Sequence, residues 1–429
     1  MSPLGFSRLE SVASLDRPAR RRDPGLRERV REIVDRVREG GWDALVAEAV
    51  RIDGAEPRLE PVGPAAAEAR RSLAADQVEA IAFAAGNISR FHEASRPRDV
   101  AVETLPGLTV RKVWRPIDRV GLYVPGGKTP LFSSLLMLAL PARAAGVGDL
   151  VVVTPPRAEG GLDPAIALAA ELCGIEAVWT VGGAQAIAAL AFGAGPIPAV
   201  DKICGPGNAW VAEAKNLVAG LPGGPAIDLP AGPSELMIIA DDGADPFTVA
   251  ADLLSQAEHD ADAQVILVTD SEDFATMVIR EVQAQSSLLP RASTIRAALA
   301  SARFLVTETL EAALEIANAY APEHLSLAVR DPEALVDRIR NAGAVFVGGQ
   351  AAETIGDYLA GSSHVLPTDG AARAWSGINV QSFMKAMSVQ NITREAAQAV
   401  AAPAALLARM EGLEAHARAA EARIAKVSA

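Results

Sequence analysis

Apolar residues recur along the chain with two different spacings, and these spacings predict where helices and strands form. In the segment 24–52 the apolar positions from Leu26 to Val34 lie three or four residues apart, which is typical of an amphipathic helix. A second, more polar helix is predicted at about 65–91. The chain is then expected to be extended as far as the glycine-rich turn after Val124. The pattern therefore opens with a helical region.

Beyond this region, short β-branched runs alternate with alanine-rich helical runs. The β-branched runs are VGLYV at 120–124, LVVVT at 150–154, EAVWT at 176–180, ELMII at 235–239, QVILV at 264–268, RFLVT at 303–307 and AVFVG at 344–348. Such alternation is typical of parallel α/β sheets, and this number of strands favours two sheets over one wide sheet. After about Pro367 no further strand is predicted, and two alanine-rich helices at 393–410 and 413–426 form a tail.

The composition narrows the class of protein. The chain has 429 residues, half of them hydrophobic, which is enough for at least two packed cores. No run reaches the roughly 18 uninterrupted apolar residues of a membrane span. With 53 acidic and 40 basic residues the net charge is -13, which disfavours a nucleic-acid partner bound through its phosphates. These properties suit a protein that binds a small neutral or cationic ligand.

The N-terminal segment and the cysteines indicate a cytoplasmic protein. Residues 1–23 are rich in arginine but lack the apolar core of a signal peptide, and we interpret them as an exposed arm. The two cysteines are too few for a disulfide framework and fit a reducing compartment. Cys204 lies beside a glycine-rich turn, but it follows an apolar strand and has no histidine nearby in the sequence. We interpret it as a packing residue rather than a nucleophile.

Three glycine-rich turns follow predicted strands and open predicted helices. They are YVPGGKTP at 123–130, VGGAQAIAAL at 181–190 and CGPGNAWV at 204–211. Backbone amides at such a turn, together with the helix dipole, can hold a pyrophosphate. None of the three is a G-x-G-x-x-G sequence followed by a ribose-reading acidic residue, so an ordinary Rossmann site is not supported. Each turn alone is more typical of a plain loop, but three at strand ends favour a nucleotide crevice.

Two pairs of polar residues are candidates for chemistry. Gln256 and His259 are three residues apart near the end of a predicted helix, so their side chains share a face and can converge on one ion. Taken alone, such a pair is more often a hydrogen-bonded surface feature. Glu323 and His324 follow Pro322 at the end of a predicted strand. In α/β sheets, ligands bind at the carboxyl ends of the strands or in crevices beside those ends. The pair is an acid-base candidate, although an exposed polar turn is the more common explanation.

Other polar residues leave more than one interpretation open. Asp357 follows the last predicted strand and stands seven residues before His364, so it is either a ligand or a helix cap. His416 lies on the tail helix five residues after Glu411, where a solvated residue is the ordinary case. His92 ends a polar helix without a neighbouring ligand type and is interpreted as structural.

Taken together and in order, these segments resemble one family, the histidinol dehydrogenases. The resemblance runs from about Phe91 to Ile424. It rests on VGLYVPGGKTPLFSSLLMLALPARAAGV, VGGAQAIAALAFG, DKICGPGNAWVAEAKNLV, LPAGPSELMIIAD, LLSQAEHDADAQ, APEHL, GDYLAGSSHVLPT, SFMKAMSVQ and EGLEAHARA. A match this long and ordered is highly specific.

The resemblance implies a metal site, an acid-base pair and a nucleotide site. One zinc ion per subunit is expected on Gln256, His259, Asp357 and His416, the last contributed across a homodimer. Glu323 and His324 are the implied acid-base residues. The implied substrate contacts are Ser234, His324, the four zinc ligands and Glu411, which also comes from the partner; the implied NAD+ contacts are Tyr123, Gln185 and Asn208. His364 is a second-tier candidate.

The reaction that the resemblance implies is the oxidation of L-histidinol to L-histidine through L-histidinaldehyde, with two NAD+, at the end of histidine biosynthesis. Zinc would orient the substrate rather than change oxidation state. His324 would accept the alcohol proton, provided that its pKa stays near neutral, and Glu323 would activate the water that adds to the aldehyde.

The implied fold consists of two incomplete Rossmann-like parallel-sheet domains with a helical appendage. We expect an arm at 1–23, a first α/β domain at 24–104 plus 236–378, an NAD-binding domain at 105–235, and a tail at 379–429 that is swapped between subunits.

Two alternatives remain. One is a paralogous zinc- and NAD-dependent dehydrogenase that acts on another polar alcohol, such as a sulfonated diol; the EGLEAH and SFMKAMSVQ segments favour histidinol instead. The other is a nucleotide-binding regulatory or structural protein without chemistry. The presence of every implied ligand and acid-base residue disfavours it.

Overall fold

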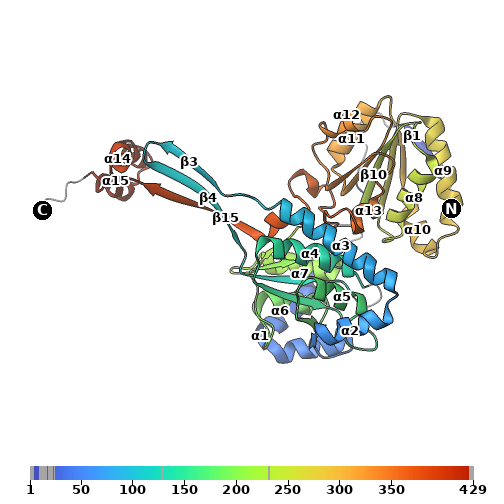
Figure 1. Ribbon diagram of the computed structural model, residues 1–429, viewed down its shortest axis with the longest axis horizontal. Helices are drawn as coiled ribbons and strands as arrows, with labels where there is room; N and C mark the ends of the chain where they lie inside the picture. The colour runs from blue at the N-terminus through green and yellow to red at the C-terminus, as the bar shows by residue number, and fades with distance from the viewer. Residues whose placement is uncertain are drawn as a thin grey trace. The chain divides into compact units, whose positions relative to one another are not determined.

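The chain forms two compact units. The computed structural model describes residues 4–8, 17, 23, 25–126, 130–229 and 232–424. The first unit comprises residues 1–95 and 118–383, and the second comprises residues 96–117 and 384–429. Figure 1 labels the helices and strands of both units.

The first unit contains two six-stranded sheets, and the first of them carries the acid-base candidates. Its strands, in spatial order, are β1 (Phe6–Arg8), β12 (Arg303–Val306), β11 (Gln264–Thr269), β10 (Glu235–Ala240), β13 (His324–Ala328) and β14 (Ala344–Val347). All neighbouring strands are parallel. Strand β10 is buried at every position because its alternate residues enter two different cores, as expected for a sheet covered on both faces.

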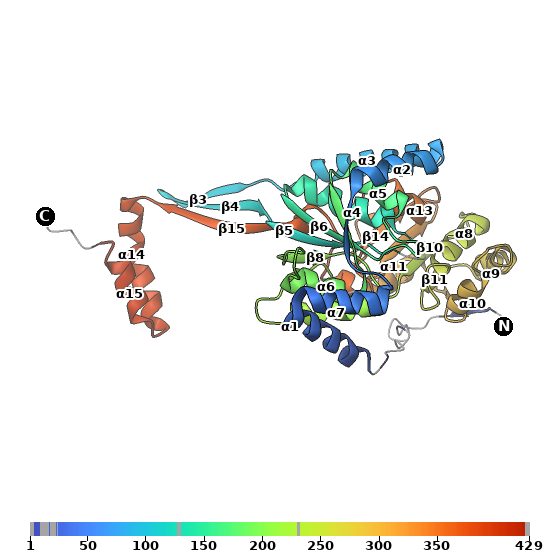
Figure 2. The ribbon, with the colours of Figure 1, turned by 90° about the horizontal axis from the view of Figure 1, so that it is seen from below.

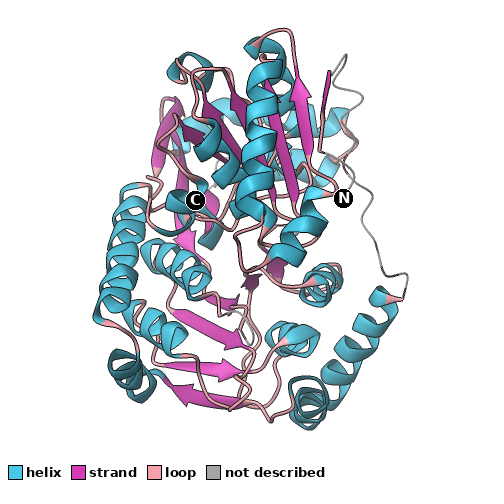
Figure 3. Cartoon of the chain, turned by 90° about the vertical axis from the view of Figure 1, so that its right-hand side faces the viewer, coloured by secondary structure: helices cyan, strands magenta, loops and turns pink. Residues whose placement is uncertain are grey.

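Helices cover both faces of this first sheet (Figures 1 and 3). The core of one face is formed with α8 (Pro246–Ala257), α9 (Glu272–Ser286) and α10 (Ala292–Leu299), and that of the other with α11 (Leu310–Tyr320) and α12 (Glu333–Val336). Asp245 caps α8 through the backbone amide of Phe247, with Pro246 in the first turn. Helix α13 (Glu353–Tyr358) follows β14, and short 3-10 turns lie at Ala371–Arg373 and Val380–Phe383.

The second sheet contains the three glycine-rich turns. Its strands, in spatial order, are β2 (Arg58–Pro61), β7 (Ala177–Thr180), β6 (Asp149–Thr154), β5 (Arg119–Tyr123), β8 (Lys202–Cys204) and β9 (Ala226–Ile227). Only the edge strand β2 is antiparallel to its neighbour among these described strands. The prediction of two parallel α/β sheets is therefore confirmed.

Two layers of helices enclose the second sheet (Figure 2). One layer contains α1 (Leu26–Asp53), α6 (Gly183–Phe192) and α7 (Ala209–Ala219), and the other contains α2 (Val62–Ser72), α3 (Ala75–Ala94), α4 (Phe132–Ala145) and α5 (Pro164–Leu172). Residues 26–94, which the sequence analysis grouped with 236–378, thus contribute a strand and three helices around the second sheet. The domain boundaries themselves stay a prediction.

The second unit is a three-stranded antiparallel sheet with a helical hairpin. Its strands are β3 (Val100–Leu105), β4 (Leu108–Pro116) and β15 (Met384–Ile392), and its helices are α14 (Arg394–Met410) and α15 (Glu414–Glu421). The two tail helices were predicted. The expectation of no strand after Pro367 is wrong, because β15 pairs with β4 along nine residues. Strand β15 is exposed at most positions, so it lacks the apolar alternation by which a strand is recognised.

Three further expectations concern the N-terminal arm, the first glycine-rich turn and membrane-spanning segments. Of the predicted arm 1–23, only residues 4–8, 17 and 23 are among the described residues; Phe6–Arg8 form the exposed edge strand β1, whereas Arg17 is partly buried. Residues 127–129 of the first glycine-rich turn lie outside the described residues. Within the described part of the chain, no helix has the length and apolar character needed to cross a membrane.

Candidate active site

The acid-base candidates lie where strands β10 and β13 begin. Glu323 directly precedes β13 and His324 is its first residue, so the pair lies at the amino end of the strand rather than at a carboxyl end. Both are held by the backbone of Glu235: its amide donates to Glu323 Oε2 at 2.9 Å, and its carbonyl oxygen lies 3.1 Å from His324 Nδ1. Because a carbonyl oxygen can only accept, Nδ1 carries the proton in this contact. Both side chains are buried.

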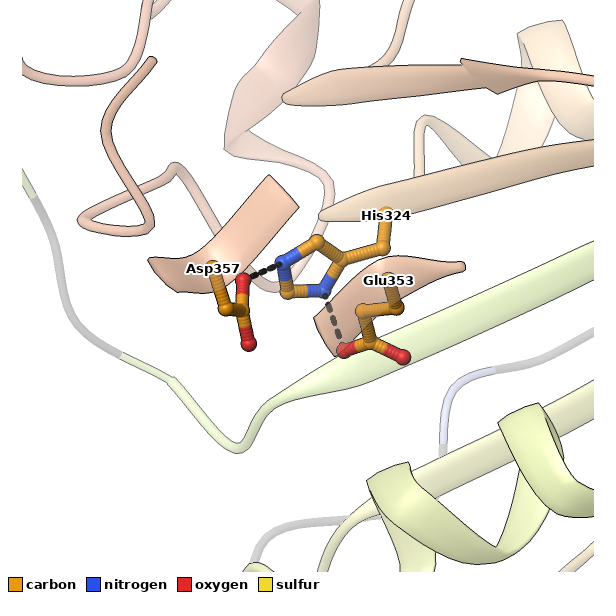
Figure 4. Close-up of side chains that lie close together, drawn as sticks. All are labelled: His324, Glu353 and Asp357. Carbon is orange, nitrogen blue, oxygen red and sulfur yellow. Dashed lines mark ion pairs between the residues drawn. The ribbon is translucent and has the colours of Figure 1, made fainter. Parts of the chain in front are cut away.

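Helix α13 supplies two carboxylates to the same imidazole. Glu353 and Asp357 are four residues apart, so they share one face of α13. Figure 4 shows the ring of His324 between them, with Nδ1 3.3 Å from Glu353 Oε1 and Nε2 3.6 Å from Asp357 Oδ1. Ligand atoms of these three residues all lie within 4.8 Å of one another. The arrangement concentrates negative charge around one buried histidine.

Several buried polar atoms of this cluster lack a hydrogen-bond partner in the described part of the structure. They are Gln256 Oε1, His324 Nε2 and both carboxylate oxygens of Glu353. Leaving a buried polar group unsatisfied costs about 1–3 kcal/mol, and more for a charged one. A fold that keeps four such atoms in one place is suited to a ligand that satisfies them.

Burial and charge shift the pKa values of this cluster in opposite directions. Burial raises the pKa of Glu323 to about 7 and that of Glu353 to about 8. Burial alone would lower the pKa of His324, but the charges of Glu323, Asp357 and Glu353 outweigh it and raise that pKa to about 10. These carboxylates therefore keep His324 cationic near neutral pH. To act as a base, His324 requires a lower pKa, close to neutral.

Gln256 lies in the last turn of helix α8, and His259 follows the end of that helix, close to this cluster. Gln256 is fully buried, and its Nε2 lies 3.0 Å from His259 Nδ1, so the amide donates to the ring. The side chains of the two residues meet, as their spacing predicts. His259 is also close enough to Asp357 for their charges to interact. An amide oxygen, imidazole nitrogens and a carboxylate form a donor set that zinc accepts, and the free Oε1 of Gln256 fits such a metal.

The remaining predicted residues divide between structural and exposed positions. Ser234 directly precedes β10 and is partly exposed. His364 has both ring nitrogens engaged: Nδ1 lies 3.0 Å from the carbonyl oxygen of Asp357, and Nε2 lies 3.1 Å from Ser134 Oγ on α4. Glu411 and His416 belong to the second unit, where both are exposed. The roles that the sequence analysis assigned to these residues stay predictions.

The three glycine-rich turns lie at the carboxyl ends of strands in the second sheet. Tyr123 ends β5, and its hydroxyl accepts the backbone amide of Gly183 at 3.3 Å. Gln185, on α6, is buried, and its Nε2 donates to Asp53 at 3.1 Å. Asn208 caps α7 through the backbone amides of the next turn. Parallel strands bring these turns to one edge, as expected for a nucleotide site.

A buried ion pair supports the third glycine-rich turn. Lys215 and Asp228 pair with side chains only 4% and 1% exposed. Lys215 Nζ donates to the carbonyl oxygen of Gly205 at 2.8 Å, and Asp228 accepts the amide of Gly205 at 2.7 Å. Gly205 has a φ of 128°, and a Cβ there would lie 2.0 Å from the carbonyl oxygen of Tyr123, so only glycine fits.

Glu353, Asp53 and the Lys215–Asp228 pair were not predicted from the sequence. For Glu353 a signal exists: it stands four residues before Asp357, a spacing that places two carboxylates on one helix face. No comparable signal marks Asp53, because it lies more than a hundred residues before the turn that it supports.

Comparisons with known proteins agree with one another. The family model described as histidinol dehydrogenase matches residues 16–424. The histidinol dehydrogenase of Xylella fastidiosa is 46% identical over 428 residues, covering 99% of both chains. That of Legionella pneumophila is 46% identical over 411 residues, covering 96% of this chain and 95% of the relative. A crystal structure of histidinol dehydrogenase from Elizabethkingia anophelis superposes with a TM-score of 0.94 at 38% identity, covering 99% of this chain and 98% of the other.

Proposed function

Because this chain belongs to the histidinol dehydrogenase family of oxidoreductases, we propose that it oxidises L-histidinol to L-histidine with two NAD+. In the first step the alcohol loses a hydride to NAD+ and a proton to the protein, which leaves L-histidinaldehyde. Water adds to the aldehyde, and the hydrate loses a second hydride to the second NAD+ and two protons to yield the carboxylate. The observation that carries the proposal is the buried, carboxylate-flanked His324 in a chain related to this family over its whole length.

The first step needs a base, and His324 Nε2 is the unpartnered atom suited to that role. We assign the zinc site to Gln256, His259, Asp357 and, across a homodimer, His416. A bound zinc ion would supply a Lewis-acid centre that orients the amine and imidazole of the substrate. With Asp357 held as a ligand, less negative charge would face His324, which would lower the pKa of His324 from about 10 and let Nε2 accept the alcohol proton.

The second step needs an activated water, and Glu323 is the proposed base. Its pKa of about 7 places it close to half ionised at neutral pH, the condition in which a carboxylate is an effective base. A thiolate mechanism for the aldehyde is disfavoured, since burial raises the pKa of Cys204 to about 12. Holding the aldehyde in the site between the two steps prevents its release.

The NAD+ site is proposed at the three glycine-rich turns. Tyr123 ends β5, Gln185 lies in the first turn of α6 after β7, and Asn208 caps α7 after β8. Gln185 Oε1 is buried without a partner in the described structure and can accept a hydrogen bond from the nucleotide. Asp53 and the Lys215–Asp228 pair hold the turns in place before the nucleotide arrives.

We also propose a homodimer that shares its sites, and the exposed apolar side chains of the second unit support it. Leu406, Leu407 and Met410 are 62%, 62% and 76% exposed on α14, directly before Glu411. Apolar side chains exposed side by side favour a partner surface. We propose that this hairpin enters the partner subunit's site and contributes Glu411 to the substrate and His416 to the metal. Two unpaired, buried cysteines are consistent with the proposed cytoplasmic location.

The test is oxidation of L-histidinol by the purified protein, followed through the absorbance of NADH. We expect two NADH per histidinol, loss of turnover after removal of metal by a chelator, and no comparable rate with a sulfonated diol. His324→Asn should lower kcat by roughly 10²–10⁴-fold while zinc content and dimer remain. Cys204→Ala is the control and should retain turnover. An unchanged rate in His324→Asn, or turnover that survives complete metal removal, contradicts the proposal.

A further inference from the structure

Among the described residues of the N-terminal arm, Arg17 reaches the candidate active site. Arg17 forms a bidentate ion pair with Glu235: Nε lies 2.9 Å from Oε1 and Nη2 lies 3.1 Å from Oε2. The same Nη2 donates to the carbonyl oxygens of Tyr320 at 2.6 Å and Ala321 at 3.3 Å. The guanidinium also stacks on the ring of Tyr320, 3.8 Å from its centroid. Arginine suits this place because its planar fork matches a carboxylate and stacks on an aromatic ring.

Glu235 is a buried carboxylate that this contact neutralises. Its side chain is 0% exposed. Two uncharged donors also reach its Oε1, Gln264 Nε2 at 3.2 Å and the backbone amide of Asp369 at 3.1 Å. A buried carboxylate that loses its cationic partner is strongly destabilising, since neutral donors do not replace the charge. The position of Glu235 therefore depends on Arg17.

The backbone of Glu235 in turn holds the side chains of both proposed acid-base residues in position. Its amide donates to Glu323, and its carbonyl oxygen accepts from His324 Nδ1. Glu235 is also the first residue of β10 and directly follows Ser234, a proposed substrate contact. A displacement of Glu235 would therefore move Glu323, which is proposed to activate water, and His324, which is proposed to take the alcohol proton.

We propose that Arg17 is a positioning residue, which clamps the side chain of Glu235 so that its backbone holds Glu323 and His324 in register. The proposal rests on the roles assigned to these two residues under the proposed function. It gives the N-terminal arm a part in catalysis without contact between Arg17 and the reactants.

Arg8 offers a matched control on the same arm. It pairs with Glu272 on α9, but the two side chains are 78% and 42% exposed, and no described contact connects them to Glu235. An exposed pair of this kind contributes little to stability. Comparison of the two arginines separates a clamp on the site from simple attachment of the arm.

The experiment compares Arg17→Ala, Arg17→Lys and Arg8→Ala in the full-length, metal-loaded protein. We expect Arg17→Ala to lower kcat for histidinol roughly 100-fold, since a misplacement of about 1 Å has that effect. Arg17→Lys should lie between it and the wild type, and millimolar guanidinium should partly restore Arg17→Ala. Arg8→Ala should stay within about twofold of the wild type. KM for NAD+ should not change in any variant, because the turns lie on the other sheet.

A second measurement does not depend on turnover. Hydrogen exchange followed by mass spectrometry should show faster exchange at the start of β10 and β13 in Arg17→Ala than in Arg8→Ala. If Arg17→Ala loses thermal stability while kcat and exchange at these strands match Arg8→Ala, the arm is only an attachment and the proposal is overturned. If the wild type fails to oxidise histidinol, the proposed function is wrong, while the exchange comparison still decides whether the clamp exists.

Discussion

Replacement of Glu323 by Gln should make the metal-free protein more stable while it abolishes turnover. Burial raises the pKa of Glu323 from its ordinary value of 4.5 to about 7, despite the nearby cationic His324. Between these two values the folded protein keeps a proton that the unfolded chain has lost. Stability therefore falls as the pH rises from 4.5 through 7, because ionising the buried carboxyl opposes folding. Gln cannot ionise, and its side-chain oxygen can still accept the amide of Glu235.

The magnitude follows from the same pKa. The gap between 4.5 and about 7, at about 1.4 kcal/mol for each pKa unit, corresponds to roughly 3 kcal/mol. The advantage of Glu323→Gln over the wild type should be absent near pH 4.5, should grow as the pH rises, and should reach this limit above pH 7. Such a gain is expected where a residue needed for catalysis lowers the stability of the fold.

Urea unfolding in the presence of a chelator, at several pH values between 5 and 8, measures this difference. Glu308→Gln is the matched control, because Glu308 is exposed in a turn of the same unit and should show no pH-dependent gain. Turnover of the metal-loaded variants is measured alongside. A loss of stability in Glu323→Gln of equal size at every pH would refute the reasoning, since it would mean that the carboxyl stabilises the fold.

Three further predictions concern other buried groups. Glu353→Gln should lower kcat more than it raises KM, because it removes a charge 3.3 Å from His324, and steady-state kinetics separate the two effects. Lys215→Met leaves Asp228 buried without a cation, so unfolding should become easier by about 3–5 kcal/mol and KM for NAD+ should rise; an unchanged KM would mean that the third glycine-rich turn does not need this pair. Burial lowers the pKa of His92 to about 4, so the wild type should lose stability as the pH falls from 6.5 to 4, by roughly 3 kcal/mol. His92→Leu should flatten that acid slope in thermal unfolding, and a retained slope would assign it to other groups.

The sequence by itself determined the features that depend on neighbours along the chain. Alternation of β-branched and alanine-rich runs predicted two parallel sheets, because strand and helix periods are local properties. The three-residue spacing of Gln256 and His259 predicted their contact for the same reason. The ordered motifs also indicated the family, which the comparisons confirm.

Only the tertiary structure decided the features that depend on residues far apart in the sequence. Strand β15 has no apolar pattern. It forms because it pairs with β4, which lies nearly three hundred residues earlier in the sequence. The role proposed for His324 requires a pKa near neutral, but three neighbouring carboxylates raise that pKa to about 10. The contact of Arg17 with Glu235 likewise joins residues 218 positions apart in the sequence. Burial and electric field are set by what folding brings together, and no local spacing encodes them.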